Sequence, residues 1–233
     1  MHDATMAASV RTRERGRAGA AFVFDALRQD IIALTLAPGT VLSRLKLQDR
    51  FGLSSTPVRD ALMRLQEEGL VEVFPQHATV VSPIDLEKAR QGQFLRRSIE
   101  SEIVRMLATK PDRHVIERLN SLIRQQSAFA KIGEYDAFTA ADQAFHNMMY
   151  LSADVSDLWE VVNRHSGHID RLRRLHLPVR GKMRDVIRDH KAIVEAIAAG
   201  EPDEAQERLR DHLSRSLGFV ETLRLNHPGY FRH

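Results

Sequence analysis

The sequence predicts a mainly α protein, in which a small N-terminal domain precedes an all-α antiparallel helical bundle. Short periodic segments separated by turn residues occupy the chain up to about residue 84. Long apolar stripes at helical spacing follow, and no convincing strand pattern occurs among them. We place the two domains at residues 18–84 and 85–225, between a flexible N-terminal arm (1–17) and a C-terminal tail (226–233).

The first domain has the element order of a winged helix-turn-helix. Helical periodicity runs from about residue 20 to 34 and stops before Pro38 and Gly39. A second helix is expected over residues 43–51, with Gly52 closing it, and a third begins near Ser55 or Thr56, either of which can cap it. The runs "LVEVF" and "ATVVS" on either side of "PQH" then predict a β-hairpin, the wing.

Six helices with short connections are predicted for the second domain, which is typical of an antiparallel bundle. Proline, glycine or an Asp/Ser cap marks each break between them. Their expected spans are 85–109, 112–132, 134–150, 155–177, 182–199 and 203–224.

Composition limits the classes of protein that fit. The formal charge of +3 over 233 residues is small, so any nucleic-acid-binding surface has to be local. The chain has no cysteine, which excludes disulfides and thiolate metal sites and fits a cytoplasmic protein. No apolar run is long enough to span a membrane, and the N-terminal segment lacks the apolar stretch of a secretory signal.

The helix-turn-helix indicates a DNA reader, because the second helix of this motif enters the major groove with its first residues at the base edges. Arg59 can pair with guanine through two hydrogen bonds. Without the motif around it, each arginine in this segment would be interpreted as a solvated surface charge. The predicted DNA-contacting residues are Arg44, Lys46, Ser54, Ser55, Thr56, Arg59, Arg64 and His77.

A carboxylate and an imidazole lie one helical turn apart in "TAADQAFHNMM", at Asp142 and His146. By themselves they fit either a hydrogen-bonded core pair or half of a metal site. His190 and His212 lie on comparable apolar stripes of two later helices. Because a buried carboxylate is costly unless it is paired or bound to metal, the four together favour a site for zinc, nickel, manganese or iron.

The segment "LKLQDRFGLSSTPVRDALMRLQEEGLVEVFPQHATVVSPI" resembles the DNA-binding domain of the GntR family of bacterial transcription regulators. The long helical half resembles the FCD domain of the FadR subfamily. Ser55 stands where family members commonly have arginine, and His77-Ala78 stands where the wing tip usually reads Arg-Gly. We therefore expect an operator sequence that differs from the common family pattern.

The resemblance implies a regulator, a repressor in our reading, which binds a pseudo-palindromic DNA operator as a homodimer. It implies a metal held by Asp142, His146, His190 and His212, with open positions for a small organic acid. Candidates to bind that acid are Arg96, Arg171, Arg174 and His168, although the "RLRR" run also fits a solvated helix face. Two alternatives stay open: a metal-dependent hydrolase, and a regulator for which the metal itself is the signal.

Overall fold

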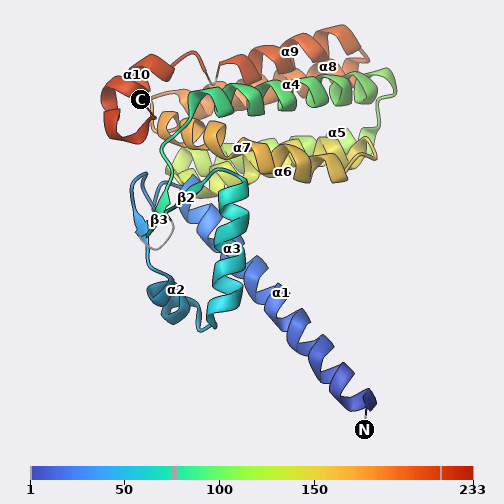
Figure 1. Ribbon diagram of the computed structural model, residues 1–233. Coiled ribbons are helices and arrows are strands. Elements are labelled where there is room, and N and C mark those ends of the chain that lie inside the picture. Colours follow the sequence, from blue (N-terminus) through green and yellow to red (C-terminus); the bar gives the residue numbers. More distant parts are fainter. Residues whose placement is uncertain (1, 75–77, 216, 233) are drawn as a thin grey trace. The chain divides into compact units, whose positions relative to one another are not determined.

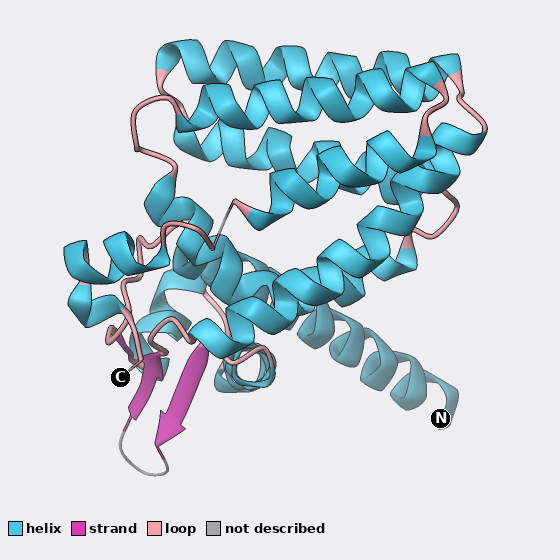
Figure 2. Cartoon of the chain, turned by 90° about the horizontal axis from the view of Figure 1, so that it is seen from above, coloured by secondary structure: helices cyan, strands magenta, loops and turns pink. Residues whose placement is uncertain are grey.

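The computed structural model describes residues 2–74, 78–215 and 217–232, and the chain divides into two compact units. The first unit contains residues 1–84 and 229–233, and the second contains residues 85–228. The first is a helical unit with a small sheet and the second is all helical, so the predicted fold class is confirmed (Figures 1 and 2). Within the described residues, no helix is both long and apolar enough to cross a bilayer.

The helices of the first unit pack around one apolar core. They are α1 (His2–Ile32), α2 (Arg44–Phe51) and α3 (Ser55–Glu67). Ser43 caps the start of helix α2 with a hydroxyl that accepts a hydrogen bond from the backbone N–H of Lys46, and Gly52 caps its end with φ of 63°. This left-handed conformation suits glycine and makes the turn into α3 tight. The core of the unit includes Val23, Leu27, Ile31, Leu47, Val58, Leu62, Leu65, Val71 and Val81.

The wing is part of a three-stranded antiparallel sheet rather than a lone hairpin. Strands β2 (Val71–Phe74) and β3 (Ala78–Val81) form the predicted pair. Strand β1 (Val41–Leu42) pairs with the other edge of β3, which gives the order β1-β3-β2. Strand β1 was not predicted because two residues are too few to show strand alternation.

Both ends of the chain differ from the expected arm and tail. Helix α1 begins at His2, so it includes the segment expected to be a flexible arm. That segment is rich in alanine and arginine and lacks proline, a composition with high helix propensity. Near the C-terminus, Phe231 is buried and forms a parallel β-bridge with Ile84, which ties the end of the chain into the first unit.

Long helices make up the second unit, and Figure 1 shows α4 to α9 running alongside one another. The bounds are α4 (Leu86–Thr109), α5 (Arg113–Ile132), α6 (Tyr135–Ser152), α7 (Asp157–His176), α8 (Lys182–Ala199), α9 (Pro202–Ser214) and α10 (Val220–Asn226), with a 3₁₀ turn at Pro228–Tyr230. Asp85 and Asp112 cap α4 and α5 with their side chains, and Gly133 and Gly200 end α5 and α8 in the left-handed conformation.

One predicted helix of this unit was wrong in length. The expected span 203–224 is two helices, because α9 ends at Ser214 and α10 begins at Val220. The intervening stretch contains Gly218, a residue that weakens a helix interior. Periodic leucines on both sides of the break hid it in the sequence.

The core of the second unit lies between its helices, including the three that carry the candidate metal ligands. Helix α4 packs on α7 and α9, α5 packs on α6 and α8, and α8 packs on α9. Phe138, Phe145, Met149, Ile193 and Val194 are almost fully buried in this core. The ring of Phe145 stacks on that of His190 with centroids 4.1 Å apart.

Candidate metal centre and DNA-reading helix

Four buried side chains converge from three helices of the second unit. Asp142 and His146 lie on α6, His190 on α8 and His212 on α9. Each offers one ligand atom, and these atoms all lie within 4.8 Å of one another. The side chains predicted from the sequence as a ligand set are thus brought together.

Each of the three imidazoles uses Nδ1 to face an acceptor outside the cluster. Nδ1 of His146 lies 2.9 Å from Oε2 of Glu100, and Nδ1 of His190 lies 2.9 Å from Oε1 of Gln126. Nδ1 of His212 lies 3.6 Å from Oδ2 of Asp189. Metal-binding histidines in proteins have partners of this kind, which orient the ring and leave Nε2 for the metal.

The atoms that face the centre of the cluster fit a cation. Oδ1 of Asp142 and Nε2 of His146 are buried and have no hydrogen-bond partner among the described residues. Nε2 of His190 lies 3.2 Å from Nε2 of His212 and 3.6 Å from Oδ1 of Asp142. Acceptor atoms crowded this closely repel one another unless a proton or a metal ion lies between them. Imidazole and carboxylate donors fit zinc, nickel, iron or manganese.

The carboxylates of the site are held ionised by arginines. Burial alone would raise the pKa of Asp142, but the positive charges near it, first of all that of Arg173, outweigh this effect, and the pKa lies well below its usual range. Burial likewise opposes the charge on Glu100, yet Arg96 and His146 lower its pKa to about 2. Arg173 donates to Oδ2 of Asp142 at 2.6 Å, so the other oxygen remains for a ligand bond.

The imidazoles, by contrast, are held neutral. Burial and the charge of Arg96 outweigh Glu100 and lower the pKa of His146 to about 4. Burial also lowers the pKa of His190 and of His212. Neutral imidazoles can bind a metal near pH 7 without first losing a proton.

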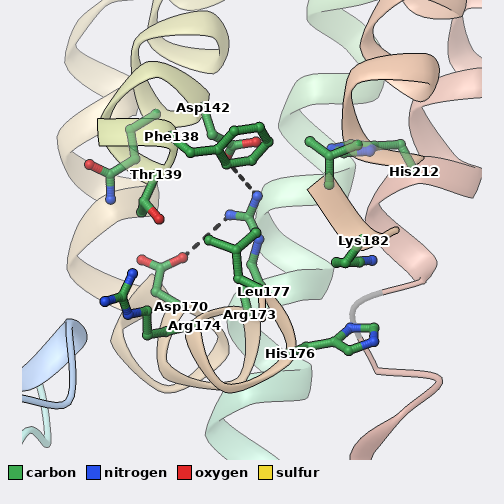
Figure 3. A pocket seen from close by; sticks show the side chains of 12 residues that line it. Phe138, Thr139, Asp142, Asp170, Arg173, Arg174, His176, Leu177, Lys182 and His212 are labelled. Atoms are coloured by element: carbon green, nitrogen blue, oxygen red, sulfur yellow. Dashed lines mark hydrogen bonds and ion pairs between the residues drawn. The ribbon is translucent and has the colours of Figure 1, made fainter. Parts of the chain in front are cut away.

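A cavity of about 50 Å³ reaches the cluster from one side. Asp142 and His212 line the end of the cavity nearest the cluster, and Phe138 and Leu177 form apolar walls (Figure 3). Arg173 also lines it, with hydrogen bonds to Asp142 and Asp170 that are dashed in Figure 3. Other basic or ionisable residues in the lining are Arg174, His176 and Lys182.

Of the four residues predicted to bind an organic acid, Arg174 lines this cavity, where it also pairs with Asp136 at 2.8 Å. Arg96 instead donates from Nε to Glu100 at 2.7 Å and lines a smaller cavity of about 10 Å³. Arg171 is fully buried, and its guanidinium contacts Nδ1 of His168 at 2.9 Å. His168 also accepts from the backbone N–H of Asp85 at 3.0 Å, and neither of these two lines the cavity.

Several residues that the structure brings to the site were not predicted from the sequence. Arg173 stands inside the same "RLRR" run as the chosen arginines, and its spacing of three residues from Asp170 does not distinguish it from Arg174, which is four residues away. Lys182 begins α8, and burial and the charge of Arg173 lower its pKa. The sequence carried no signal that Glu100, Gln126 and Asp189 pair with histidines on other helices.

The residues predicted to read DNA form an exposed group at α2 and α3. Ser54 precedes α3 and provides no side-chain cap, and Ser55 and Thr56 are its first residues, so neither of the two expected caps is the N-cap. Arg59 is exposed one turn further on, paired loosely with Asp60 at 3.5 Å. Arg44 and Lys46 are exposed on α2.

Arg64 and His77 differ from the other predicted DNA contacts. Arg64 is exposed, but its guanidinium lies over the ring of Phe24, 3.9 Å from the centroid. This contact occupies one face of the guanidinium group. His77, predicted at the tip of the wing, lies outside the described residues.

Two family models match the chain, one in each unit. Residues 20–81 match the model described as bacterial regulatory proteins of the gntR family, and residues 93–215 match the FCD domain. The first match covers the helix-turn-helix and wing, and the second covers all four candidate ligands.

Proteins named as HTH-type transcriptional regulators match nearly the whole chain. An uncharacterized HTH-type transcriptional regulator of an unstable DNA locus in Streptomyces ambofaciens is 33% identical over 93% of this chain and 91% of its own. The HTH-type transcriptional repressor RspR of Escherichia coli K12 is 27% identical, over 90% and 92%. The structure of E. coli McbR/YncC has the same fold, with a TM-score of 0.75 and 18% identity over 90% of this chain and 98% of that one.

Proposed function

Because the chain belongs to the GntR family of bacterial regulatory proteins and is a DNA-binding transcription regulator rather than an enzyme, we propose that a small organic acid controls its binding to operator DNA through a metal site. The FCD domain fits the FadR subfamily. Repressors occur among the relatives, RspR of E. coli being one, and we propose that this chain is also a repressor.

The DNA-binding part of the proposal assigns α3 to the major groove. Ser55, Thr56 and Arg59 lie at or near the start of this helix and are exposed, so they can reach base edges and phosphates. We propose that a homodimer presents two such helices to successive half-sites of a pseudo-palindromic operator. Arg44 and Lys46 on α2 would then contact the flanking backbone.

In the metal-binding part, Asp142, His146, His190 and His212 hold a divalent transition metal. Their ligand atoms lie within 4.8 Å of one another, and two of them have no hydrogen-bond partner among the described residues. When bound, the metal supplies a Lewis-acidic position for a carboxylate oxygen.

One observation carries the organic-acid part: the cavity that reaches Asp142 and His212 is lined by Arg173, Arg174 and Lys182. Guanidinium and ammonium groups recognise carboxylates, and the apolar walls of Phe138 and Leu177 suit a short carbon skeleton. We propose that the acid binds with its carboxylate at the metal end and that its arrival alters the contacts of Arg173 with Asp142 and Asp170. A ligand with different affinities for DNA-competent and incompetent states shifts the balance between them.

Metal analysis of the purified protein followed by a thermal-shift screen of small carboxylates tests the proposal. We expect about one metal ion per chain and a rise in Tm with one class of acid. That rise should vanish when the metal is chelated. A protein with metal but no response to any acid would favour the metal itself as the signal, and a protein without bound metal would contradict the site.

A further inference from the structure

Gln126 on α5 is fully buried and contacts the metal cluster from outside. Its Oε1 lies 2.9 Å from Nδ1 of His190, and its Nε2 donates to the backbone carbonyl of Ala141 at 3.3 Å. Ala141 directly precedes the candidate ligand Asp142. The side chain therefore joins the backbone next to one ligand on α6 to the imidazole of another on α8.

The contact with Ala141 determines which end of the amide faces His190. A carbonyl oxygen only accepts, so the amide end that bonds to it must be the NH₂ group. The amide oxygen is then turned toward His190, and because this oxygen also only accepts, Nδ1 of His190 must carry a proton. A neutral imidazole protonated at Nδ1 has its lone pair on Nε2, the atom that faces the cluster.

Without this partner, His190 has a competing arrangement. Its Nε2 lies 3.2 Å from Nε2 of His212, close enough for a hydrogen bond if the proton moved to Nε2 of His190. In that tautomer Nε2 of His190 would donate a hydrogen bond to Nε2 of His212, and the lone pair of His190 would be on Nδ1, which points away from the cluster. Metal binding would then first require the proton to move.

We propose that Gln126 is a positioning residue which fixes His190 as its Nδ1–H tautomer and so keeps Nε2 available to the metal. Its consequence for metal affinity rests on the metal site proposed above, whereas the tautomer itself does not. Glu100 and Asp189 face the other two imidazoles with carboxylates. Gln126 performs the same task with a neutral group and therefore adds no negative charge to the site.

Two substitutions separate the hydrogen bond from packing. Gln126→Met keeps the length of the side chain but removes the strong acceptor. Gln126→Glu restores an acceptor oxygen for Nδ1, and in its protonated form it also restores a donor for Ala141. Gln206→Met is the matched control, since Gln206 also donates to a backbone carbonyl, that of Ser101 at 3.0 Å, but has no contact with the cluster among the described residues.

Nitrogen NMR of the histidine side chains in chelator-treated protein reads the tautomer, and competition between protein and a chelator for Zn²⁺ reads the affinity. We expect Nδ1–H for His190 in the unmodified protein, in Gln126→Glu and in Gln206→Met, and a shift toward Nε2–H in Gln126→Met. We expect Zn²⁺ affinity to fall about 10- to 100-fold in Gln126→Met and to recover most of that loss in Gln126→Glu.

An Nε2–H tautomer in the unmodified protein would overturn the proposal without reference to any variant. So would a Gln126→Met protein that keeps the Nδ1–H tautomer and binds Zn²⁺ within about threefold of the unmodified protein. If the unmodified protein has the Nδ1–H tautomer but does not bind Zn²⁺, the proposed metal site fails while the assignment to Gln126 stands.

Discussion

Glu100 contacts a candidate metal ligand and an arginine at the same time. Its Oε2 lies 2.9 Å from Nδ1 of His146, and its Oε1 accepts a hydrogen bond from Nε of Arg96 at 2.7 Å. The carboxylate is completely buried, and the arginine is nearly so. Arg96 was expected from the sequence to hold an organic acid. In the structure it compensates the charge of Glu100, the carboxylate that orients His146.

Replacing Arg96 with alanine should destabilise the metal-free protein by about 3–5 kcal/mol, because breaking a buried pair leaves an uncompensated charge. Urea unfolding of the chelator-treated protein measures this loss. Arg105→Ala on the same helix is the control, since Arg105 pairs with Glu102 at the surface and its removal should change stability little. Equal losses in the two variants would show that Glu100 does not depend on Arg96.

The stability of the metal-free protein should fall between about pH 6.5 and 4. The pKa of His146 is about 4 in the folded protein, against an ordinary value of 6.5, because burial and Arg96 outweigh Glu100. In that range the unfolded chain takes up a proton that the folded protein does not, so stability is present above this range and is lost as pH decreases. The expected slope is about 1 kcal/mol per pH unit for each such histidine. Urea unfolding at a series of pH values would measure it, and a slope that is unchanged in His146→Gln would contradict this assignment.

Replacing His190 with alanine should lower metal content and thermal stability together, because metal binding stabilises the folded state. Elemental analysis and thermal unfolding of the same sample provide the two measurements. His114→Ala, at an exposed histidine of α5, should change neither. Full metal occupancy in His190→Ala would remove His190 from the ligand set.

Replacing Lys182 with methionine should weaken binding of the organic acid about tenfold, the effect of losing one charge-assisted hydrogen bond. Affinity for Zn²⁺ should remain the same, since Lys182 lines the cavity but is not one of the four candidate ligands. Calorimetric titration of the acid into metal-loaded protein tests this. Lys191→Met, at an exposed lysine of α8 that does not line this cavity, is the control. If both variants bind the acid equally well, the acid does not contact Lys182.

Replacing Arg59 with alanine should reduce operator affinity and relax base preference at one position of each half-site, with a cost of about 1–3 kcal/mol. Fluorescence anisotropy at matched salt, on an operator selected from random DNA and on its single-base variants, provides the measurement. Arg113→Ala, an exposed arginine of the other unit, should bind like the unmodified protein. A uniform loss across all base variants would mean that Arg59 contacts only phosphate.

Features with a short sequence period were predictable. The i, i+4 spacing of Asp142 and His146, and the apolar stripes that carry His190 and His212, identified the side chains which the structure brings within 4.8 Å. Capping residues and turn glycines such as Gly52 and Gly200 located the helix ends, because each acts on the backbone immediately beside it. These signals are local, and helix geometry alone converts them into a shared face.

Contacts between distant segments were not predictable. Gln126 and His190 are 64 residues apart, and Glu100 and His146 are 46 apart, so no local period relates them. Within the "RLRR" run, one residue shifts a side chain by about 100° around a helix. Choosing among its arginines therefore requires knowing which face of the helix is turned toward Asp142, and the sequence prediction named Arg171 and Arg174 whereas the structure brings Arg173 to Asp142.

The affinity of the metal-loaded protein for its operator, measured with and without each acid of a small-carboxylate panel, tests the central claim most directly. We expect at least one acid to weaken operator binding about tenfold or more in the unmodified protein, which corresponds to a coupling free energy of the usual size between two sites. The same acid should have little effect on His190→Ala. Operator binding that no acid changes, or that changes equally in His190→Ala, would contradict control by an organic acid through this metal site.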